Sequence, residues 1–404
     1  MCGEEGAENI VACAVLGMTK DSRTHVLHTE GVRVAPTQDV LYAEIDLELS
    51  WSERELPERE RTKHVHRLHP YLGKFIPQLV EALLGRYVVA GGRVLDPFAG
   101  SGTTLVQSLE SGRDAVGVDI AAFNCLLMGV KTRRYDLFAL ETEIRDVVRR
   151  VEAFEGGPKP TGYAAEWFAP QAARELLAFR DLVGEYEHED VLRVVLARAA
   201  RSARRTPHYD LDFPRTPQVE PYWCHKHKRI CRPVEHAEHF LRRYAIDTLA
   251  RIKEFSRVRA RGRAREVEVL HDDSREIDYR GRFDGVVTSP PYPGLIDYHE
   301  QHRYAYELLG LDDRREVELG AAAGGTSVAA LASYVDGVAA VLARARGSLR
   351  ARSPVVIVVH DRRDLYPEIL DRAGLRLEER LRRHVNRRTG RRAGEFFEDI
   401  LIAR

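Results

Sequence analysis

The spacing of apolar side chains predicts the first half of an α/β sheet between residues 76 and 130. An apolar stripe at helical spacing ends at a glycine, and an apolar strand then runs into a glycine-rich turn. A helix, a second apolar strand and another helix follow this turn. Strand, glycine turn, helix and strand in this order are typical of a doubly wound sheet. The expected elements are helices at 79–84, 103–109 and 122–130 and strands at 93–96 and 114–119.

The strand pattern then stops for about 130 residues and resumes near residue 266. The intervening sequence has helical periodicity, except for a proline-rich irregular piece from 206 to 233. We therefore expect one α/β sheet domain that is interrupted by a helical insertion over 136–261. The expected helices of the insertion lie at 138–154, 171–184, 189–201 and 234–257. The expected later strands lie at 266–270, 283–288, 354–359, 375–383 and 395–403.

Composition describes a globular chain of 404 residues, of which 44% are hydrophobic and 31% are charged. This length predicts two domains, or one large domain with an insertion. The sheet domain would then comprise 61–135 and 262–404. The first sixty residues hold 13 Asp and Glu against 5 Lys and Arg, and we expect an acidic arm or a small hairpin at 1–60.

Three features of the sequence favour the reducing cytoplasm as the location of the chain. No apolar run reaches the ~18 residues that span a bilayer, so no membrane partner is expected. The N-terminus carries Glu4, Glu5 and Glu8, whereas a secretory signal begins with basic residues. The five cysteines are an odd number without regular spacing, which argues against a disulfide framework.

The turn after the first strand has the residue types of a ligand-binding loop. Its glycines let backbone N–H groups approach a ligand, and the N-terminus of the following helix favours anionic groups. The Gly-Lys-Ser/Thr ending of a phosphate-binding loop and the G-x-G-x-x-G pattern of dinucleotide sites are both missing. Asp119 ends the second strand, where an acid can accept hydrogen bonds from ribose hydroxyls. A tight turn without a ligand is the alternative. The loop comprises Asp96, Pro97, Phe98, Ala99, Gly100, Ser101, Gly102, Thr103 and Thr104.

The loop Asp-Pro-Phe-Ala-Gly-Ser-Gly-Thr-Thr at 96–104 resembles the S-adenosylmethionine loop of the amino DNA methyltransferases, which methylate exocyclic nitrogens of cytosine or adenine. The tetrapeptide Ser-Pro-Pro-Tyr at 289–292 is similar to the catalytic motif of that family. Either motif alone also fits a plain turn, but the two on one sheet are a specific signal. The resemblance covers 64–133 and 264–404. It implies a doubly wound, Rossmann-like methyltransferase sheet with S-adenosyl-L-methionine as its cofactor.

The resemblance gives each residue of the tetrapeptide a role in methyl transfer. An exocyclic amine conjugated to its ring is a poor nucleophile, because its lone pair is delocalised. The hydroxyl of Ser289 and the backbone carbonyl of Pro290 would accept its N–H bonds and aim the lone pair at the methyl group. Pro290 and Pro291 fix the backbone. Tyr292 offers a face on which a flipped-out base can stack.

Further cofactor contacts are implied outside the glycine loop. In the segment ahead of the loop, Phe75 and Pro77 would close over the methionine end of the cofactor, and a hydrophobic staple on the following helix is the alternative. Asp273, or Asp272 beside it, stands where the family contacts the adenine amino group, although an ordinary helix N-cap fits as well. Ile120, directly after the ribose-binding acid, is a further expected contact.

The tetrapeptide and the cysteines bear on which base is methylated. Methylation at cytosine C5 needs a thiolate, which that other family carries in a Pro-Cys dipeptide, and this sequence has no Pro-Cys. In the amino family, Ser-Pro-Pro-Tyr mostly accompanies cytosine, which points to N4 of cytosine in double-stranded DNA. The alternatives are N6 of adenine, a base in structured RNA, and a nucleic-acid-binding protein with a degenerate methyltransferase fold. A restriction endonuclease acting on the same site would be a partner, unless the enzyme is a solitary methylase.

The formal net charge of zero conceals a segregation of charge along the chain. Residues 191–265 hold 19 Lys and Arg against 7 Asp and Glu, interleaved with aromatic residues. Such a mixture suits phosphate contacts and base stacking, so the insertion is the expected DNA target-recognition region. A charged face that only solvates the helices is the alternative. A second basic cluster at 382–392 would hold the other side of the duplex. The expected DNA-binding residues are Arg204, Arg205, Lys226, Lys228, Arg229 and Arg232.

Cysteines and histidines in the proline-rich piece raise the question of a metal. Cys224, His225, His227 and Cys231 lie close together, but the two cysteines are seven residues apart. This spacing does not match the paired Cys-x-x-Cys patterns of zinc sites. The sequence alone therefore favours no metal.

Overall fold

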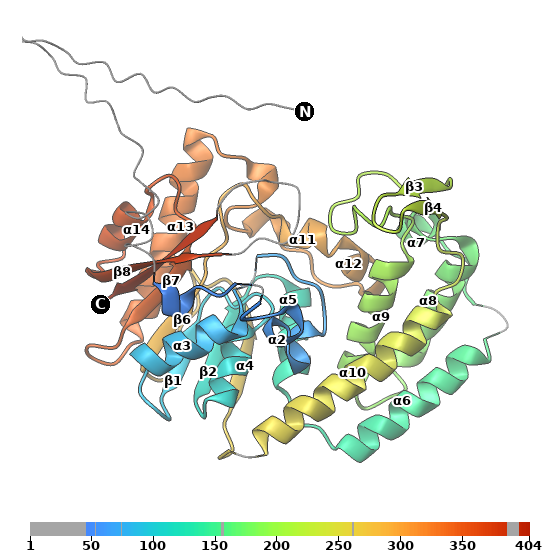
Figure 1. Cartoon of the computed structure of the whole chain (residues 1–404), viewed down its shortest axis with the longest axis horizontal. Helices are drawn as coiled ribbons and strands as arrows, with labels where there is room; N and C mark the ends of the chain where they lie inside the picture. Colours follow the sequence, from blue (N-terminus) through green and yellow to red (C-terminus); the bar gives the residue numbers. More distant parts are fainter. Residues whose placement is uncertain (1–45, 53, 74, 155–156, 261, 386–395) are drawn as a thin grey trace, which may run out of the picture. The chain divides into compact units, whose positions relative to one another are not determined.

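A seven-stranded sheet is the frame of the computed structural model, which describes residues 46–52, 54–73, 75–154, 157–260, 262–385 and 396–404. The strand order is β5-β2-β1-β6-β7-β9-β8 (Figure 1). The first five strands in this order are parallel, and β9 runs antiparallel to both of its neighbours. The strands are β1 (Arg93–Asp96), β2 (Asp114–Asp119), β5 (Val267–His271), β6 (Gly285–Thr288), β7 (Val355–Val359), β8 (Leu377–His384) and β9 (Phe397–Ala403).

The central strands are apolar between their end residues, as is typical of strands that helices cover on both faces of the sheet. In β1, Val94 packs on the side of α3 (Pro77–Tyr87) and α4 (Thr103–Glu110). Its neighbour Leu95 packs on the side of α13 (Val328–Gly347) and α14 (Tyr366–Arg372). This arrangement confirms the predicted doubly wound α/β fold, and every predicted strand begins within two residues of its expected start.

The helices of the insertion share a core with the sheet domain. Val106 of α4 and Phe123 of α5 (Ala122–Thr132) belong to the same buried cluster as Leu192 of α9. Figure 1 shows the long helices α6, α8, α9 and α10 side by side, next to α5. The insertion contains α6 (Leu137–Glu152), α7 (Gly162–Trp167), α8 (Pro170–Val183), α9 (Glu189–Ala203), β3 (Tyr222–Cys224), β4 (Arg229–Cys231) and α10 (Glu238–Arg259).

Helices α7, α13 and α14 and the β3–β4 hairpin are additions to the elements predicted from sequence. By length and composition alone, α13 could cross a membrane. It carries Asp336 and Arg344, however, and eight of its residues are buried, among them Val338 and Leu342 in the core beside the sheet. A core helix of a globular protein passes the same test, so this one helix is weak evidence for a span. The remaining short elements are η1 (Leu47–Leu49), α2 (Glu58–Arg61), η2 (His64–Arg67), α11 (Tyr298–Gln301), α12 (Arg303–Leu309), η3 (Arg315–Val317) and η4 (Ala322–Gly324).

Most of the acidic arm predicted at 1–60 lies outside the described residues, which begin at Asp46. The N–H of Asp46 donates to the carbonyl of Arg382 in β8 at 2.8 Å, and Arg86 of α3 donates to the Asp46 carboxylate at 2.9 Å. Leu49 is fully buried. The described end of the arm is therefore fixed to β8 and α3.

Candidate active site

The carboxyl ends of β1 and β6 lie at the point where the strand order of the sheet reverses. In open α/β sheets, ligands bind in the crevice at such a point. Asp96 ends β1 and Thr288 ends β6, and the Thr288 hydroxyl donates to the Asp96 carboxylate at 2.6 Å. Both side chains are buried, and burial raises the pKa of Asp96 to about 6. This hydrogen bond ties the start of the glycine loop to the start of the tetrapeptide.

The glycine loop turns into α4 through two residues with positive φ, Gly100 at 51° and Gly102 at 80°. Residues with a side chain rarely adopt this conformation. A Cβ on Gly100 would lie 3.0 Å from the hydroxyl oxygen of Tyr71, and one on Gly102 would lie 2.7 Å from Cγ of Met128. Space and backbone conformation together therefore require glycine at both positions.

Asp119, at the end of β2, is the centre of a hydrogen-bond network beside the loop. Its carboxylate accepts the N–H of Gly100 at 2.8 Å and that of Ala121 at 2.9 Å. The side-chain amide of Asn124 donates to Asp119 at 3.0 Å and to the Tyr71 hydroxyl at 3.1 Å. Burial raises the pKa of Asp119. Within the described residues, Oδ1 of Asn124 is buried without a hydrogen-bond partner, which fits a ligand that brings hydroxyl or amino donors.

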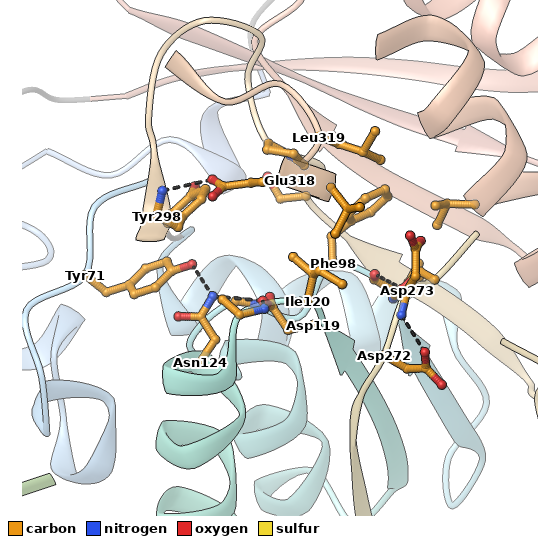
Figure 2. A pocket seen from close by; sticks show the side chains of 18 residues that line it. Tyr71, Phe98, Asp119, Ile120, Asn124, Asp272, Asp273, Tyr298, Glu318 and Leu319 are labelled. Carbon is orange, nitrogen blue, oxygen red and sulfur yellow. Dashed lines mark hydrogen bonds between the residues drawn. The ribbon is translucent and has the colours of Figure 1, made fainter. Parts of the chain in front are cut away.

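These groups line a cavity at the carboxyl edge of the sheet, and Figure 2 shows Tyr298 and Glu318 across it from Asp119 and Asn124. Of the predicted cofactor and catalytic residues, the lining contains Pro97, Phe98, Gly100, Asp119, Ile120, Asp273, Ser289 and Pro291. The lining also contains Asp272, the alternative to Asp273. Predicted residues outside the lining are Phe75, Pro77, Asp96, Ala99, Ser101, Gly102, Thr103, Thr104, Pro290 and Tyr292.

The segment ahead of the glycine loop reaches the cavity through Tyr71. Its ring stacks on that of Tyr298, with centroids 5.3 Å apart and 15° between the planes. Phe75 is buried in the core below α3, and Pro77 is the buried first residue of that helix. Neither residue lines the cavity. Their predicted contacts with the methionine end of a cofactor therefore stay predictions.

The chain between the tetrapeptide and α13 closes one side of the cavity. Glu318 accepts the N–H of Tyr298 at 2.9 Å, and its other oxygen lies 2.6 Å from Nδ1 of His299. The sequence-based prediction did not include Glu318, Asn124 or Tyr71 among the cofactor contacts. For Asn124, the sequence held two usable signals. It is one of only three asparagines in the chain, and it follows a strand that ends in an acid.

Among the described residues of the cavity wall, the charged side chains are all acidic: Asp119, Asp272, Asp273 and Glu318. Asp273 also accepts from Nε of Arg275 at 2.9 Å, and its N–H donates to Asp272 at 2.8 Å. An acidic wall favours a cationic ligand and disfavours phosphate groups. The sulfonium, ammonium and ribose hydroxyls of S-adenosylmethionine match this wall and its acceptor oxygens, so the residues present fit the cofactor.

The tetrapeptide leaves β6 along the edge of this cavity. The Ser289 hydroxyl donates to the carbonyl of Val358 in β7 at 2.9 Å, so its oxygen keeps lone pairs to accept another hydrogen bond. The Pro291 carbonyl accepts from the Tyr334 hydroxyl at 2.9 Å. Among the described residues, no donor is bonded to the carbonyl of Pro290. Two acceptors of the tetrapeptide, the Ser289 hydroxyl and the Pro290 carbonyl, therefore have capacity for a further hydrogen bond.

Tyr292 lines a second cavity next to the first. Its hydroxyl donates to Glu398 at 3.3 Å, and burial raises the pKa of Tyr292 well above its usual range. The ring of His360 lies 6.2 Å from that of Tyr292 and 4.1 Å from that of Phe396. Because Ser289 and Pro291 line the first cavity and Tyr292 the second, the tetrapeptide separates an acidic cavity from an aromatic one.

The basic residues predicted to contact DNA differ in exposure. Arg204 is buried, with its guanidinium carbon 4.3 Å from the ring centre of Tyr304 and a hydrogen bond to the Leu211 carbonyl at 2.6 Å. This burial corrects the prediction for Arg204, because a guanidinium enclosed by protein cannot reach a phosphate. Arg205 is partly buried and donates to the Glu166 carbonyl at 3.5 Å. The exposed residues are Lys226, Lys228, Arg229 and Arg232.

Of two other predicted groups of side chains, one is described only in part and the other contains a different histidine. In the basic cluster at 382–392, the positions from 386 onward lie outside the described residues, and Arg383 is buried in an ion pair with Glu398 at 2.8 Å. Among the cysteines and histidines of the insertion, the structure gathers Cys224, His227 and Cys231 with His208 instead of His225.

The chain is similar to curated Type II methyltransferases. It is 34% identical to the Type II methyltransferase M.MjaII of Methanocaldococcus jannaschii over 429 aligned residues, which cover 85% of this chain and 81% of that protein. It is 24% identical to the Type II methyltransferase M.MvaI of Kocuria varians, over 62% of this chain and 59% of that protein. Among solved structures, the rRNA methyltransferase aviRa from Streptomyces viridochromogenes matches with a TM-score of 0.33 and 14% identity, over 83% of this chain and 88% of that one.

A family profile described as DNA methylase matches residues 27–128, a range that contains the glycine loop and Asp119. The similarity to the relative from Methanocaldococcus jannaschii extends over most of both chains. The fold, the cavity and these matches agree with one another. The chain therefore belongs to the amino DNA methyltransferases, within the Type II DNA methyltransferases, and S-adenosyl-L-methionine is its cofactor.

Proposed function

We propose that the chain transfers a methyl group from S-adenosylmethionine to N4 of cytosine at a specific sequence in double-stranded DNA. The observation that carries the proposal is the place of the tetrapeptide between the acidic and the aromatic cavity. A cofactor in the first cavity and a flipped-out base in the second would meet at Ser289. The Ser-Pro-Pro-Tyr form of the tetrapeptide favours cytosine over adenine.

The two acceptors of the tetrapeptide act on the exocyclic amine of the base. When bound, S-adenosylmethionine supplies an electrophilic methyl group on a sulfonium. The Ser289 hydroxyl, whose hydrogen is directed at Val358, accepts one N–H bond, and the Pro290 carbonyl accepts the other. Both bonds draw the nitrogen toward tetrahedral geometry and hold its lone pair in line with the methyl group. The ring of Tyr292 supports the base by stacking.

Other residues of the acidic cavity orient the cofactor. Asp119 accepts hydrogen bonds from the ribose hydroxyls, and the unpartnered Oδ1 of Asn124 accepts a further donor. Asp272 and Asp273 stand at the edge that the family uses for the adenine amino group. Because Asp273 is already paired with Arg275, Asp272 is as good a candidate for this contact.

Expression of the chain in a host without N4-cytosine and N6-adenine methylation is expected to place N4-methylcytosine at one sequence motif of the host DNA. Mass spectrometry of hydrolysed DNA identifies the modified base, and methylome sequencing locates the motif. Cells that express Ser289→Ala are the matched control and should carry far less of the modification. N6-methyladenine in place of N4-methylcytosine would contradict the base assignment. Transfer to structured RNA but not to duplex DNA, measured with purified enzyme, would contradict the substrate.

We further propose that the insertion contacts DNA through the β3–β4 hairpin. Lys226, Lys228 and Arg229 are exposed on it, and none of them forms an ion pair with a described residue. Trp223 and Ile230 beside them are 49% and 59% exposed, so large apolar side chains share the surface with the cations. Cations next to an exposed aromatic ring suit phosphate contacts and base stacking.

Replacing Lys226, Lys228 and Arg229 together by alanine is expected to weaken binding to duplex DNA of any sequence. Each lost phosphate contact should also reduce the slope of log K against log salt by about 0.9, because fewer counterions are released. Fluorescence anisotropy at several salt concentrations measures both effects. The matched control is Arg376→Ala, which removes an 82% exposed cation at the amino end of β8. A triple variant with the salt slope of the wild type would exclude the hairpin from the DNA interface.

We also propose that a restriction endonuclease with the same sequence specificity is the functional partner of the chain. The support is that its relatives are named Type II methyltransferases. The cytoplasmic location expected from the sequence stays a prediction.

A further inference from the structure

Four side chains that suit a transition metal meet in the insertion, although they are spread over 24 residues of sequence. His208 comes from the proline-rich piece after α9, and Cys224, His227 and Cys231 come from the β3–β4 hairpin. Their ligand atoms all lie within 4.8 Å of one another. The two cavities on either side of the tetrapeptide contain none of these residues. The cluster is therefore separate from the methyl-transfer site.

Distances within this cluster are those expected between ligands of a tetrahedral metal ion. Sγ of Cys224 lies 3.6 Å from Nδ1 of His208, and Sγ of Cys231 lies 3.4 Å from Nδ1 of His227. The rings of the two histidines are 4.5 Å apart between centroids. Zinc bonds of ~2.3 Å to sulfur and ~2.05 Å to nitrogen at tetrahedral angles separate the two atoms by about 3.6 Å.

We propose that the chain binds one zinc ion through His208, Cys224, His227 and Cys231, as a structural site. Two thiolates balance the charge of Zn²⁺, two neutral imidazoles complete the tetrahedron, and no position is left for a substrate. The ligand set of sulfur and nitrogen in this geometry favours zinc over calcium or magnesium, which prefer oxygen. On binding, the two thiols release their protons to solvent.

The hairpin is short, and a metal would link it to the rest of the insertion. Strands β3 and β4 are three residues long, and isolated hairpins even of ordinary length are at best marginally stable in water. The turn holds Lys228 at a φ of 54°, which residues other than glycine rarely adopt. Trp223 and Ile230 face solvent, so they add little to a core. Zinc would join both strands to the preceding proline-rich piece.

A neighbouring group positions the backbone of one ligand. The Tyr222 hydroxyl accepts the backbone N–H of His208 at 3.0 Å. The same hydroxyl lies 2.7 Å from Nδ1 of His208, the nitrogen nearest to Cys224, so zinc at Nδ1 would replace this contact. His225 lies in the same turn, is exposed and is outside the cluster, which makes it a matched control.

Full-length protein from zinc-supplemented cells, purified without chelators, is expected to hold zinc in a one-to-one ratio by elemental analysis. After replacement with Co²⁺, it should show the visible bands and the sulfur-to-cobalt charge-transfer band of a tetrahedral thiolate site. Cys224→Ser and Cys231→Ser should lose the zinc, whereas His225→Ala should keep it. Wild-type protein without zinc and without the cobalt spectrum would overturn the proposal, and this measurement needs no variant to fold. Loss of zinc from His225→Ala would overturn the ligand assignment.

A second readout links the metal to DNA, and it alone rests on the proposed function. Because the hairpin carries Lys226, Lys228 and Arg229, protein stripped of zinc by a chelator is expected to bind duplex DNA more weakly. The Kd for S-adenosylmethionine should not change, since the cofactor cavity lies elsewhere. Zinc-bound and zinc-free protein with the same DNA affinity would contradict this link while the measured zinc content still supports the metal site.

Discussion

Replacement of Ser289 by alanine is expected to lower kcat for methyl transfer by about 10²–10³-fold and to leave the Kd for S-adenosylmethionine nearly unchanged. The amine nitrogen gains positive charge as it attacks the methyl group, so its N–H bonds become stronger donors in the transition state than in the ground state. An acceptor at Ser289 therefore stabilises the transition state more than the bound base. Alanine leaves only the Pro290 carbonyl for this task.

Single-turnover kinetics on a methylatable duplex and calorimetry with the cofactor measure the two quantities separately for Ser289→Ala. Ser111→Ala is the matched control, because the Ser111 hydroxyl also donates to a backbone carbonyl, that of Gln107 at 2.8 Å, away from both cavities. It should keep the turnover of the wild type. Full activity of Ser289→Ala would remove this hydroxyl from the mechanism, and a large rise in the cofactor Kd would show a binding role instead.

The sheet was predictable because its central strands are buried on both faces, so they read as uninterrupted apolar runs between turns. All side chains of β7 are buried, for example. Helix α13 carries small apolar residues nearly all round, so its sequence lacks the contrast between two faces that predicts a helix. Strands β3 and β4 have three residues each, too few to show the alternation of apolar and polar side chains that predicts a strand.

The candidate site was predictable where its residues are contiguous in sequence. The glycine loop and the tetrapeptide are local motifs, and each contributes lining residues directly. Tyr71, Asn124 and Glu318 come from three separate segments, and only the topology of the sheet brings them to one edge. Arg204 shows where a count of charges along the chain fails as a predictor, because the count does not reveal that this guanidinium is buried against Tyr304.

Asp119→Asn is expected to raise the Kd for S-adenosylmethionine by about 100-fold, which corresponds to about 3 kcal/mol of binding free energy. One oxygen of Asp119 accepts from Ala121 and Asn124, and the other accepts from Gly100. An asparagine has one acceptor oxygen, so its NH₂ group must face a donor on one side. The side chain also loses an acceptor for the ribose hydroxyls, and the glycine loop loses the bond that fixes Gly100.

Calorimetry across a range of pH tests both the contact and its charge. Because burial raises the pKa of Asp119, its carboxylate should take up a proton at a higher pH than an exposed aspartate does. Acidification should therefore weaken cofactor binding by the wild type through Asp119, whereas Asp119→Asn should lack this dependence on pH. Asp114→Asn is the matched control: this carboxylate begins the same strand and accepts the N–H of Glu266 at 2.9 Å, at the end of β2 opposite the cavity. Its variant should bind the cofactor like the wild type. Equal affinities of wild type and Asp119→Asn would contradict a ribose contact at Asp119.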